Sequence, residues 1–341
     1  MTQSGLPAPS KMFGRTATMP SSEAWANMRR REFIAGLSGA VAMPLTSRAQ
    51  QTSLPAVGFL HSASAEANQK RRAAFLDGLT ATGYVAGRNV TIEYRWADGK
   101  FVRLPLLAEQ LVRHPVSVLV AFAPPTVLAA RTATATIPIV FFMGGDPVKL
   151  GLVQSFSRPG GNITGIAAMT ISLVAKRLEL IRSLVPHADT VAFVFNPSNP
   201  TAAEQLEAVH SAAQSLGQNV IELGVTNETE LEALANTITR VRPKALVIGA
   251  VSFLISQRNK LVALAARHSL PAIYETRDSV VSGGLVSYAP DFDDGYRQTG
   301  IYVGSGPPSR TDPLIDPRAA RLVDGEIHET VGKRLFSSKR F

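Results

Sequence analysis

Cysteine is absent from the 341 residues of this chain. Disulfides, thiolate metal sites and cysteine nucleophiles are therefore excluded, and so is an N-terminal cysteine that carries a lipid anchor. The six histidines stand apart in the sequence, without the H-x-H or H-E-x-x-H spacing that places two ligands on one metal ion. We expect neither a bound metal nor another cofactor.

A concentration of positive charge is also lacking. The formal net charge is +9, but part of the excess lies within residues 1–49, and the remaining Lys and Arg residues are scattered. A nucleic-acid interface needs a basic stripe or patch, because phosphate contacts supply much of the affinity. We expect a mildly basic protein that does not bind nucleic acid.

Sequence motifs for catalysis are missing as well. No G-x-S-x-G elbow, Walker G-x-x-x-x-G-K-[S/T] or G-x-G-x-x-G follows an apolar run. The Gly144–Gly145 pair lacks the Lys-Ser/Thr that a nucleoside triphosphate with Mg²⁺ requires. We predict that the chain is not an enzyme.

The apolar run near the N-terminus is too short to span a membrane. Ala35–Leu45 is about half of the roughly 20 residues that a span needs. It follows a run of three arginines and precedes the small-x-small sequence Ser47–Ala49, which is the layout of a cleavable secretory signal. Arg30–Ile34 fits the twin-arginine pattern. We predict that residues 1–49 are an N-terminal extension and twin-arginine signal peptide, cleaved near Ala49, and that the mature protein is periplasmic. The alternative is a basic surface helix.

Beyond this segment the sequence alternates between apolar runs and helical patterns. The apolar runs are residues 57–61, 90–94, 116–121 and 137–142, with helical patterns such as residues 71–82 and 104–113 between them. Because the runs are almost continuously apolar, each predicts a strand that is buried on both faces. The alternation predicts a parallel sheet with helices on both sides.

The same order of runs returns about 130 residues later, at residues 191–195, 217–222, 244–249 and 270–274. Four matches in order, at a nearly constant spacing, indicate a duplicated unit of the size of a whole lobe. We predict an α/β fold of two doubly wound parallel-sheet lobes with a ligand cleft between them. Lobe 1 is expected over residues 54–162 with about 283–304, and lobe 2 over residues 163–282.

Local signals place several boundaries. Asn227-x-x-Glu230 predicts the start of a helix, and Pro186 predicts the end of another. In the glycine-rich stretch after residue 141, Gly144–Pro147 predicts a turn at the cleft and Val148–Ser157 a short helix. Asn162–Gly165 is interpreted as the beginning of a segment that crosses to the second lobe.

The polar residues that follow the predicted strands are candidates for a ligand site. In open α/β sheets the ligand crevice lies outside the carboxyl ends of the strands. The loops at these ends are His61–Ser64, Ala123–Thr126, Gly144–Pro147, Asn196–Ser198, Val251–Phe253 and Glu275–Thr276. They are rich in Ser, Thr, Asn and single carboxylates, and several precede helices, whose free N–H groups favour an anion.

Most of these residues also have a purely structural explanation. Ser62, Thr126 and Asn196 could serve only to cap helices. Asp146 could start a helix rather than hold the ammonium group of a ligand. Glu275 is harder to explain in this way, because a carboxylate that ends a buried strand needs a partner.

Motifs along the chain resemble one family closely. They include G-L-x-x-x-G-Y at residues 78–84, R-P-G-G-N-I-T-G at 158–165 and P-A-I-Y-E at 271–275. Over residues 28 to about 304 the chain resembles the ABC-transporter substrate-binding proteins of the tryptophan/tyrosine type. The resemblance implies a type I periplasmic binding fold in a monomer that closes on a small molecule, with aromatic amino acids as suggested ligands. It also implies delivery to an inner-membrane ABC permease and its ATPase. The matching ligand positions are Ser62, Pro125, Thr126, Asp146, Asn196, Ser252, Phe253 and Glu275.

Two departures from the family pattern stand out. Relatives often carry an acidic residue in the loop after Ala250, where this chain has Val251–Ser252, and the loss of that carboxylate argues against an amino-acid ligand. Residues 305–341 do not continue the family's final strand and helix, and their many prolines and few apolar groups predict a disordered tail.

A ligand-sensing regulator is the alternative to a solute-binding protein, because the same two-lobed core serves transcription factors. Such a regulator is expected to carry a DNA-binding helix-turn-helix before the core. This chain has the signal-like segment at that place, which favours the solute-binding protein.

Overall fold

The computed structural model describes residues 54–306 and 328–329. The predicted signal peptide, in residues 1–49, lies outside the described residues, and so does most of the predicted tail over residues 305–341. In the described part of the chain, no helix is both long and apolar enough to cross a bilayer.

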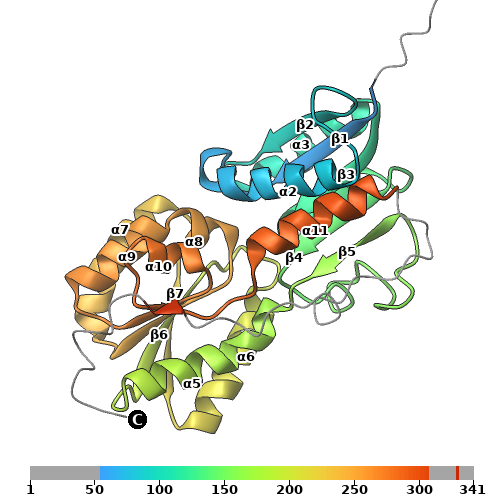
Figure 1. The fold of residues 1–341 in the computed structure, drawn as a ribbon. Coiled ribbons are helices and arrows are strands. Elements are labelled where there is room, and N and C mark those ends of the chain that lie inside the picture. The colour runs from blue at the N-terminus through green and yellow to red at the C-terminus, as the bar shows by residue number, and fades with distance from the viewer. Residues whose placement is uncertain (1–53, 307–327, 330–341) are drawn as a thin grey trace, which may run out of the picture. The chain divides into compact units, whose positions relative to one another are not determined.

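The first lobe is built on a five-stranded parallel sheet in the order β2-β1-β3-β4-β5 (Figure 1). Its strands are β1 Ala56–His61, β2 Thr91–Trp96, β3 Val116–Phe122, β4 Ile139–Met143 and β5 Ile163–Ala167. Its helices are η2 Glu66–Asn68, α2 Gln69–Ala81, η3 Phe101–Arg103, α3 Leu104–Arg113, α4 Pro124–Ala133 and, from the far end of the chain, α11 Phe292–Gly304.

Both faces of this sheet are covered, as the apolar runs predict. Alternate residues of β3 point to opposite sides: Leu119 packs in a cluster with α3 and α4, whereas Val118 and Val120 pack in a cluster with α2 and α11. A strand that is buried on both faces has no polar side to show, so its sequence is nearly continuous in apolar residues.

The second lobe repeats the first. Its parallel strands follow the order β10-β9-β8-β6-β7, and β11 adds to the edge of β10 in the antiparallel sense. The strands are β6 Thr190–Phe195, β7 Asn219–Gly224, β8 Ala245–Ile248, β9 Ala272–Tyr274, β10 Val286–Ser287 and β11 His328–Glu329. The helices are η4 Thr170–Leu173, α5 Val174–Leu184, α6 Ala202–Leu216, α7 Glu228–Val241, α8 Ser252–Ser256, α9 Arg258–Arg267 and α10 Arg277–Val281. Read from β7, this order matches that of the first sheet, which confirms the predicted two-lobed α/β fold.

The chain passes between the lobes later than the sequence indicates. β5 pairs with β4 along its whole length, so the first sheet continues past residue 162 to Ala167. Gly165 lies with a positive φ of 157° against the backbone of Phe141, where a side chain has no room. This glycine belongs to a strand, although its neighbours look like a turn in the sequence. On the return, β10 still pairs with β9, so the second lobe extends to Ser287 rather than ending near residue 282.

The predicted helix over Val148–Ser157 is wrong. This segment consists of turns and bends. Gly151 takes a positive φ of 63°, as Gly160 and Gly161 do at 71° just beyond the segment, and these left-handed positions interrupt any helical ladder. The buried Leu152 and Val153 instead anchor the loop on the core of the first lobe.

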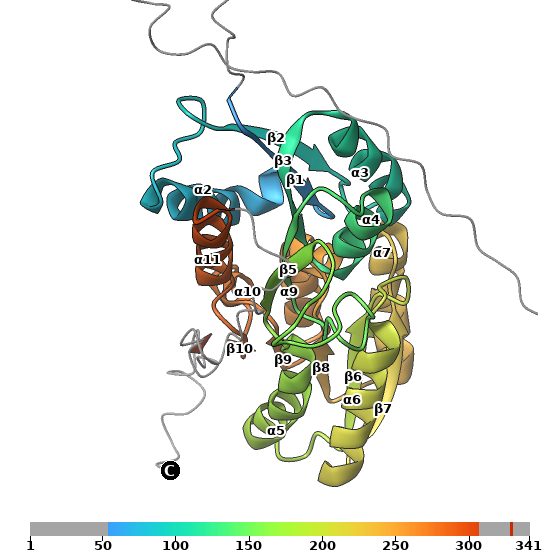
Figure 2. The ribbon, with the colours of Figure 1, turned by 90° about the vertical axis from the view of Figure 1, so that its right-hand side faces the viewer.

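Helix α11 completes the first lobe by packing along α2 (Figures 1 and 2). The two helices approach closely because glycines face the contact. A side chain on Gly78 would meet the carbonyl group of Arg297, and one on Gly300 would meet the carbonyl oxygen of Phe75. The contact brings two helices that are far apart in the sequence to one face of the first sheet.

Candidate ligand site

A cavity of about 700 Å³ of empty space, partly open to solvent, lies at the carboxyl ends of the strands. Both lobes line it. The polar lining residues are His61, Asn68, Arg71 and Tyr296 from the first lobe and Thr170, Asn199, Thr201, Ser252, Ser256 and Glu275 from the second. The position is the one that an open α/β sheet predicts.

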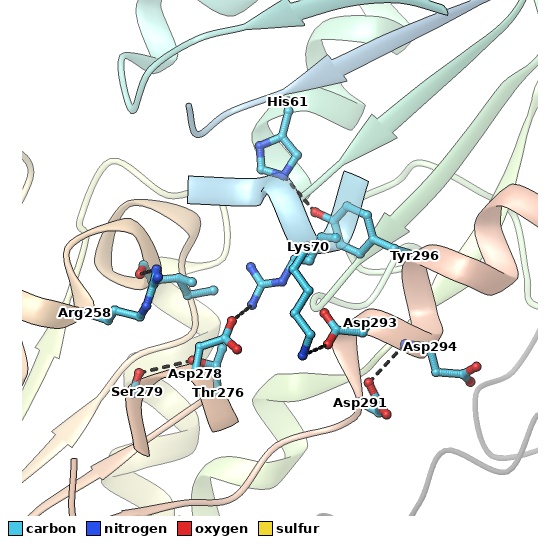
Figure 3. A network of polar contacts seen from close by, with 12 residues as sticks. His61, Lys70, Arg258, Thr276, Asp278, Ser279, Asp291, Asp293, Asp294 and Tyr296 are labelled. Atoms are coloured by element: carbon cyan, nitrogen blue, oxygen red, sulfur yellow. Dashed lines mark hydrogen bonds and ion pairs between the residues drawn. The ribbon is translucent and has the colours of Figure 1, made fainter. Parts of the chain in front are cut away.

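His61 and Tyr296 form a buried pair that ties the end of β1 to α11 (Figure 3). The Ala63 N–H donates to His61 Nδ1 at 2.9 Å, so the ring hydrogen is on Nε2, which donates to the Tyr296 hydroxyl at 2.8 Å. Burial, together with the nearby charge of Arg71, lowers the pKa of His61 to about 3. The histidine is therefore neutral, and Tyr296 keeps its own hydroxyl hydrogen for another acceptor.

Arg71 is a buried cation in the first turn of α2. The residue is 6% exposed. Its Nη2 donates to Asp278 Oδ2, from α10 of the second lobe, at 3.4 Å, and its Cζ lies 5.1 Å from the centroid of the Phe292 ring. Nε has no hydrogen-bond partner in the described part of the chain. The guanidinium thus forms one long ion pair across the cleft, and its Nε–H donor remains without an acceptor among the described residues.

Glu275 is the buried acid of the cavity. Its Oε1 accepts a hydrogen bond from the Val251 N–H at 3.3 Å, and its Oε2 has no partner among the described residues. Burial raises the pKa of this carboxyl to about 8, against the opposing effects of Arg177, the Val251 N–H and Arg71. Glu275 therefore carries its proton at neutral pH.

Arg177 lies behind Glu275, on α5, and is fully buried. Its Nε donates to the Tyr288 carbonyl oxygen at 2.9 Å, while Nη1 and Nη2 have no partner among the described residues. Burial lowers the pKa of Arg177, and Glu275 opposes this shift when it is ionised. A guanidinium remains protonated in proteins, so a positive charge stays beside the acid.

A chain of hydrogen bonds fixes Asn199 at the wall of the second lobe. Asn199 Oδ1 accepts from the N–H and the hydroxyl group of Thr201 at 2.9 and 2.8 Å. Gln205 Nε2 donates to Thr201 Oγ1 at 2.9 Å, and Gln205 Oε1 accepts from the Ala250 N–H at 3.2 Å. The amide oxygen of Asn199 is fully used, which leaves its NH₂ group as a donor at the cavity.

The residues predicted from the sequence divide into two groups. Ser252 and Glu275 line the cavity. Ser62, Pro125, Thr126, Asp146, Asn196 and Phe253 do not, although each lies close to the carboxyl end of a strand. Whether any of the eight binds ligand stays a prediction.

Several residues of the second group bond to the nearby backbone, but no side chain of the group caps α4 or α6. Thr126 Oγ1 donates to the carbonyl oxygens of Phe122 and Ala123, and Asn196 Oδ1 accepts from the Ser198 N–H at 2.8 Å. Asp146 Oδ1 accepts from the N–H groups of the two residues after Pro147, which makes a turn rather than a helix start. Phe253 packs in the core of the second lobe.

Arg71, Asn199 and Tyr296 line the cavity but do not follow a predicted strand directly. One signal could have identified Arg71. It lies four and seven positions before the buried Phe75 and Gly78, so it shares their helix face despite its charge. Tyr296 reaches the cavity from α11, and its neighbours in the sequence give no sign that it contacts His61 at the end of β1.

The fold and the interlobe cavity define the class of the protein, the two-lobed type I periplasmic binding proteins. The family model described as ABC transporter substrate binding protein matches residues 56–305. The chain belongs to this family.

Individual relatives agree with this assignment. A tyrosine-binding protein of Clostridioides difficile (strain R20291) is 27% identical over 230 residues, which are 67% of this chain and 66% of the relative. The aligned region is thus slightly less than two thirds of that protein. Among solved structures, a conserved domain protein from Vibrio cholerae has a TM-score of 0.73 at 25% identity and covers 81% of this chain and 91% of its own. The fold is also that of an ABC domain in complex with L-Trp from Streptococcus pneumonia, with a TM-score of 0.71 at 22% identity over 83% of this chain and 95% of that one.

Proposed function

We propose that this chain is the periplasmic solute-binding protein of an ABC importer. It holds a small organic ligand between its lobes by hinge closure and presents the ligand to an inner-membrane permease and its ATPase. The observation that carries the proposal is the cavity itself, because residues of both lobes line it. A ligand that touches both walls stabilises the closed arrangement of the lobes.

Contacts across the cleft support the closing motion. Lys149 Nζ of the first lobe lies 3.0 Å from Glu204 Oε1 of the second, and Arg71 pairs with Asp278. The chain passes between the lobes through the short segments 168–169 and 288–291. Such element-terminal segments are where hinges absorb changes in backbone angles.

The polar groups of the cavity suit binding better than catalysis. His61 is held neutral and Glu275 protonated, and both are fixed by backbone N–H groups rather than paired as an acid and a base. We propose Ser252 and Glu275 of the predicted set as ligand-binding residues, together with Arg71, Asn199 and Tyr296. The names of the relatives, a tyrosine-binding protein and a domain in complex with L-Trp, make compounds with an aromatic ring the first candidates for the ligand.

Export through the twin-arginine route, with cleavage near Ala49, remains part of the proposal. It rests on the arginine-led apolar segment of the sequence. Secretion of a tagged chain tests this part separately. A tagged copy that stays in the cytoplasm would favour the ligand-sensing regulator instead.

A thermal-shift screen of the full chain against amino acids and small organic acids tests the binding function. A ligand that binds only the folded chain raises the melting temperature by mass action, with a stabilisation of about 2.7 kcal/mol at one hundred times its dissociation constant. We expect at least one compound to do so. The absence of stabilisation by any compound at millimolar concentration would contradict the function.

A further inference from the structure

The chemistry of the cavity narrows the class of its ligand, on the assumption that the proposed solute-binding function is correct. We infer that the ligand is a small organic acid with one carboxylate, an apolar, aromatic-sized body and no ammonium group. Its carboxylate binds between Arg71 and Tyr296 on the wall of the first lobe.

The buried charges of the chain are unbalanced. Among the described residues, only three charged side chains are buried, namely the cations Arg71 and Arg177 and the single acid Glu275. If Glu275 is ionised it compensates Arg177, and if it is protonated it compensates neither. In the first case one guanidinium lacks a buried counter-charge and in the second both do, and an unpaired buried charge is costly. A ligand with one net negative charge reduces this imbalance, whereas an ammonium group adds to it.

Arg71 is the cation that a ligand can reach, because it lines the cavity and Arg177 does not. Its one ion pair is long, at 3.4 Å, and the Asp278 side chain that makes it is 34% exposed. The guanidinium keeps N–H donors beyond the Nη2 bond to Asp278, and it can present two donors in one plane to the two oxygens of a carboxylate. Asp278 therefore leaves room for a second, better buried anion.

Tyr296 supplies a second donor to the same carboxylate. His61 donates its only N–H to the tyrosine oxygen, since the other ring nitrogen accepts from Ala63. The tyrosine O–H must then donate elsewhere, and Tyr296 lines the cavity. Asn199 offers its NH₂ group from the opposite lobe as a further donor, since its amide oxygen is already used.

Among the described residues that line the cavity, no ionised acid is placed to receive an ammonium group. Glu275 is the one carboxylate in the described part of the lining, and its burial beside Arg177 disfavours pairing with a further cation. The loop that begins at Val251 and Ser252 adds no acid. An amino acid could satisfy Arg71, but its ammonium group would be left without a partner.

Apolar side chains also line the cavity. Phe142 and Phe292 lie edge to face with ring centroids 5.9 Å apart, and Phe142 and Tyr296 lie 5.4 Å apart. Ile171, Val251 and Ile255 line the cavity from the second lobe. Aromatic faces on one side and aliphatic groups on the other suit a flat hydrocarbon body.

The test compares three compounds that share one ring and differ in their charged groups: a carboxylate with an ammonium group, a carboxylate alone, or an ammonium group alone. Isothermal titration calorimetry on the full chain uses L-tyrosine, 3-(4-hydroxyphenyl)propanoate and tyramine, and a second set uses L-tryptophan, indole-3-propanoate and tryptamine. We expect at least one propanoate to bind at least tenfold more tightly than the matching amino acid, and neither amine to bind. An amino acid that equals or exceeds its propanoate, an amine that binds, or a failure of both propanoates to bind overturns the inference. The ligand series uses the unchanged chain, so it does not depend on the folding of any variant.

Variants then locate the carboxylate. Arg71→Gln should weaken propanoate binding at least thirtyfold, and Arg71→Lys should weaken it less because the charge remains without the fork. Arg72→Gln is the matched control, since Arg72 is the next residue of α2 and lies over the Tyr94 ring, outside the cavity. Circular dichroism checks that each variant folds. Equal propanoate affinities of folded Arg71→Gln and Arg72→Gln would refute the assigned position. If amino acids bind and propanoates do not, the inferred ligand class is wrong but the solute-binding function stands. If no compound stabilises the chain in the thermal-shift screen, the proposed function itself is contradicted.

Discussion

Replacing Glu275 by Gln should remove a loss of stability that the chain suffers between pH 6.5 and 8. Burial raises the pKa of Glu275 from 4.5 to about 8. In this interval the folded chain holds the Glu275 proton and the unfolded chain has released it. Stability falls with pH wherever the folded state binds more protons, so the free energy of unfolding decreases as the pH rises from about 4.5 to 8. Glutamine keeps an acceptor for the Val251 N–H and does not titrate.

The size of the effect follows from the width of the interval. One pKa unit corresponds to about 1.4 kcal/mol. The 1.5 units between pH 6.5 and 8.0 therefore correspond to about 2 kcal/mol, slightly reduced because Glu275 is half ionised at pH 8. His61 has little influence here, because burial lowers its pKa from 6.5 to about 3 and its opposite contribution is nearly complete at pH 6.5.

Urea unfolding of the full chain at pH 6.5 and 8.0, followed by circular dichroism, measures the effect. The wild-type chain should lose about 1.5–2 kcal/mol more than Glu275→Gln over this interval. Glu207→Gln, at an exposed position of α6, should behave as the wild type. Parallel pH dependences of the wild-type chain and Glu275→Gln would refute the assignment of Glu275 as a buried, protonated acid.

Three further predictions concern the helices and the cavity. Gly300→Ala should lower the free energy of unfolding by about 1–3 kcal/mol in urea titrations, because the added methyl group meets the carbonyl oxygen of Phe75; unchanged stability would contradict the close packing of α2 and α11. Asn227→Ala should lower the free energy of unfolding by about 1 kcal/mol, because it removes the side-chain cap of α7. Asn236→Ala, within the same helix, should leave this free energy nearly unchanged. Equal effects of the two substitutions in urea titrations would argue against the cap. Calorimetry should show that propanoate affinity falls as the pH rises past 8, because ionised Glu275 adds a negative charge near Arg71, Arg177 and the Val251 N–H. The Glu275→Gln variant should lose this pH dependence. A propanoate affinity that rises with pH would contradict the predicted effect of Glu275.

The lobes could be predicted from the sequence because their central strands are buried on both faces. Residues of β3 and β6 are apolar almost without interruption, and the same order of strands occurs twice. The prediction of Asn227 as a helix start is confirmed, since its side chain accepts from the Glu230 N–H. This bond joins residues only three positions apart, so the sequence itself contains the signal. Features that depend on close neighbours in the chain, or on repetition, can be read from one sequence.

The glycine-rich stretch and the cavity could be predicted only in part. Gly165 looks like a turn residue, but it is a strand residue that lies against the Phe141 backbone, and only the packed sheet reveals this. His61 and Tyr296 are 235 positions apart and meet only because α11 returns to pack on α2. Arg71 looks like an ordinary helical surface cation until its burial is known.

The most direct test of the account is whether a ligand closes the two lobes. The chain has no cysteine, so Val148→Cys with Ala203→Cys gives two unique sites for spin labels. These positions adjoin Lys149 and Glu204, whose charged groups pair across the cleft at 3.0 Å. Pulsed electron paramagnetic resonance should show a distance between the labels that shortens and narrows when the compound that most raises the melting temperature is added. An identical distance distribution with and without a compound that calorimetry shows to bind would contradict hinge closure.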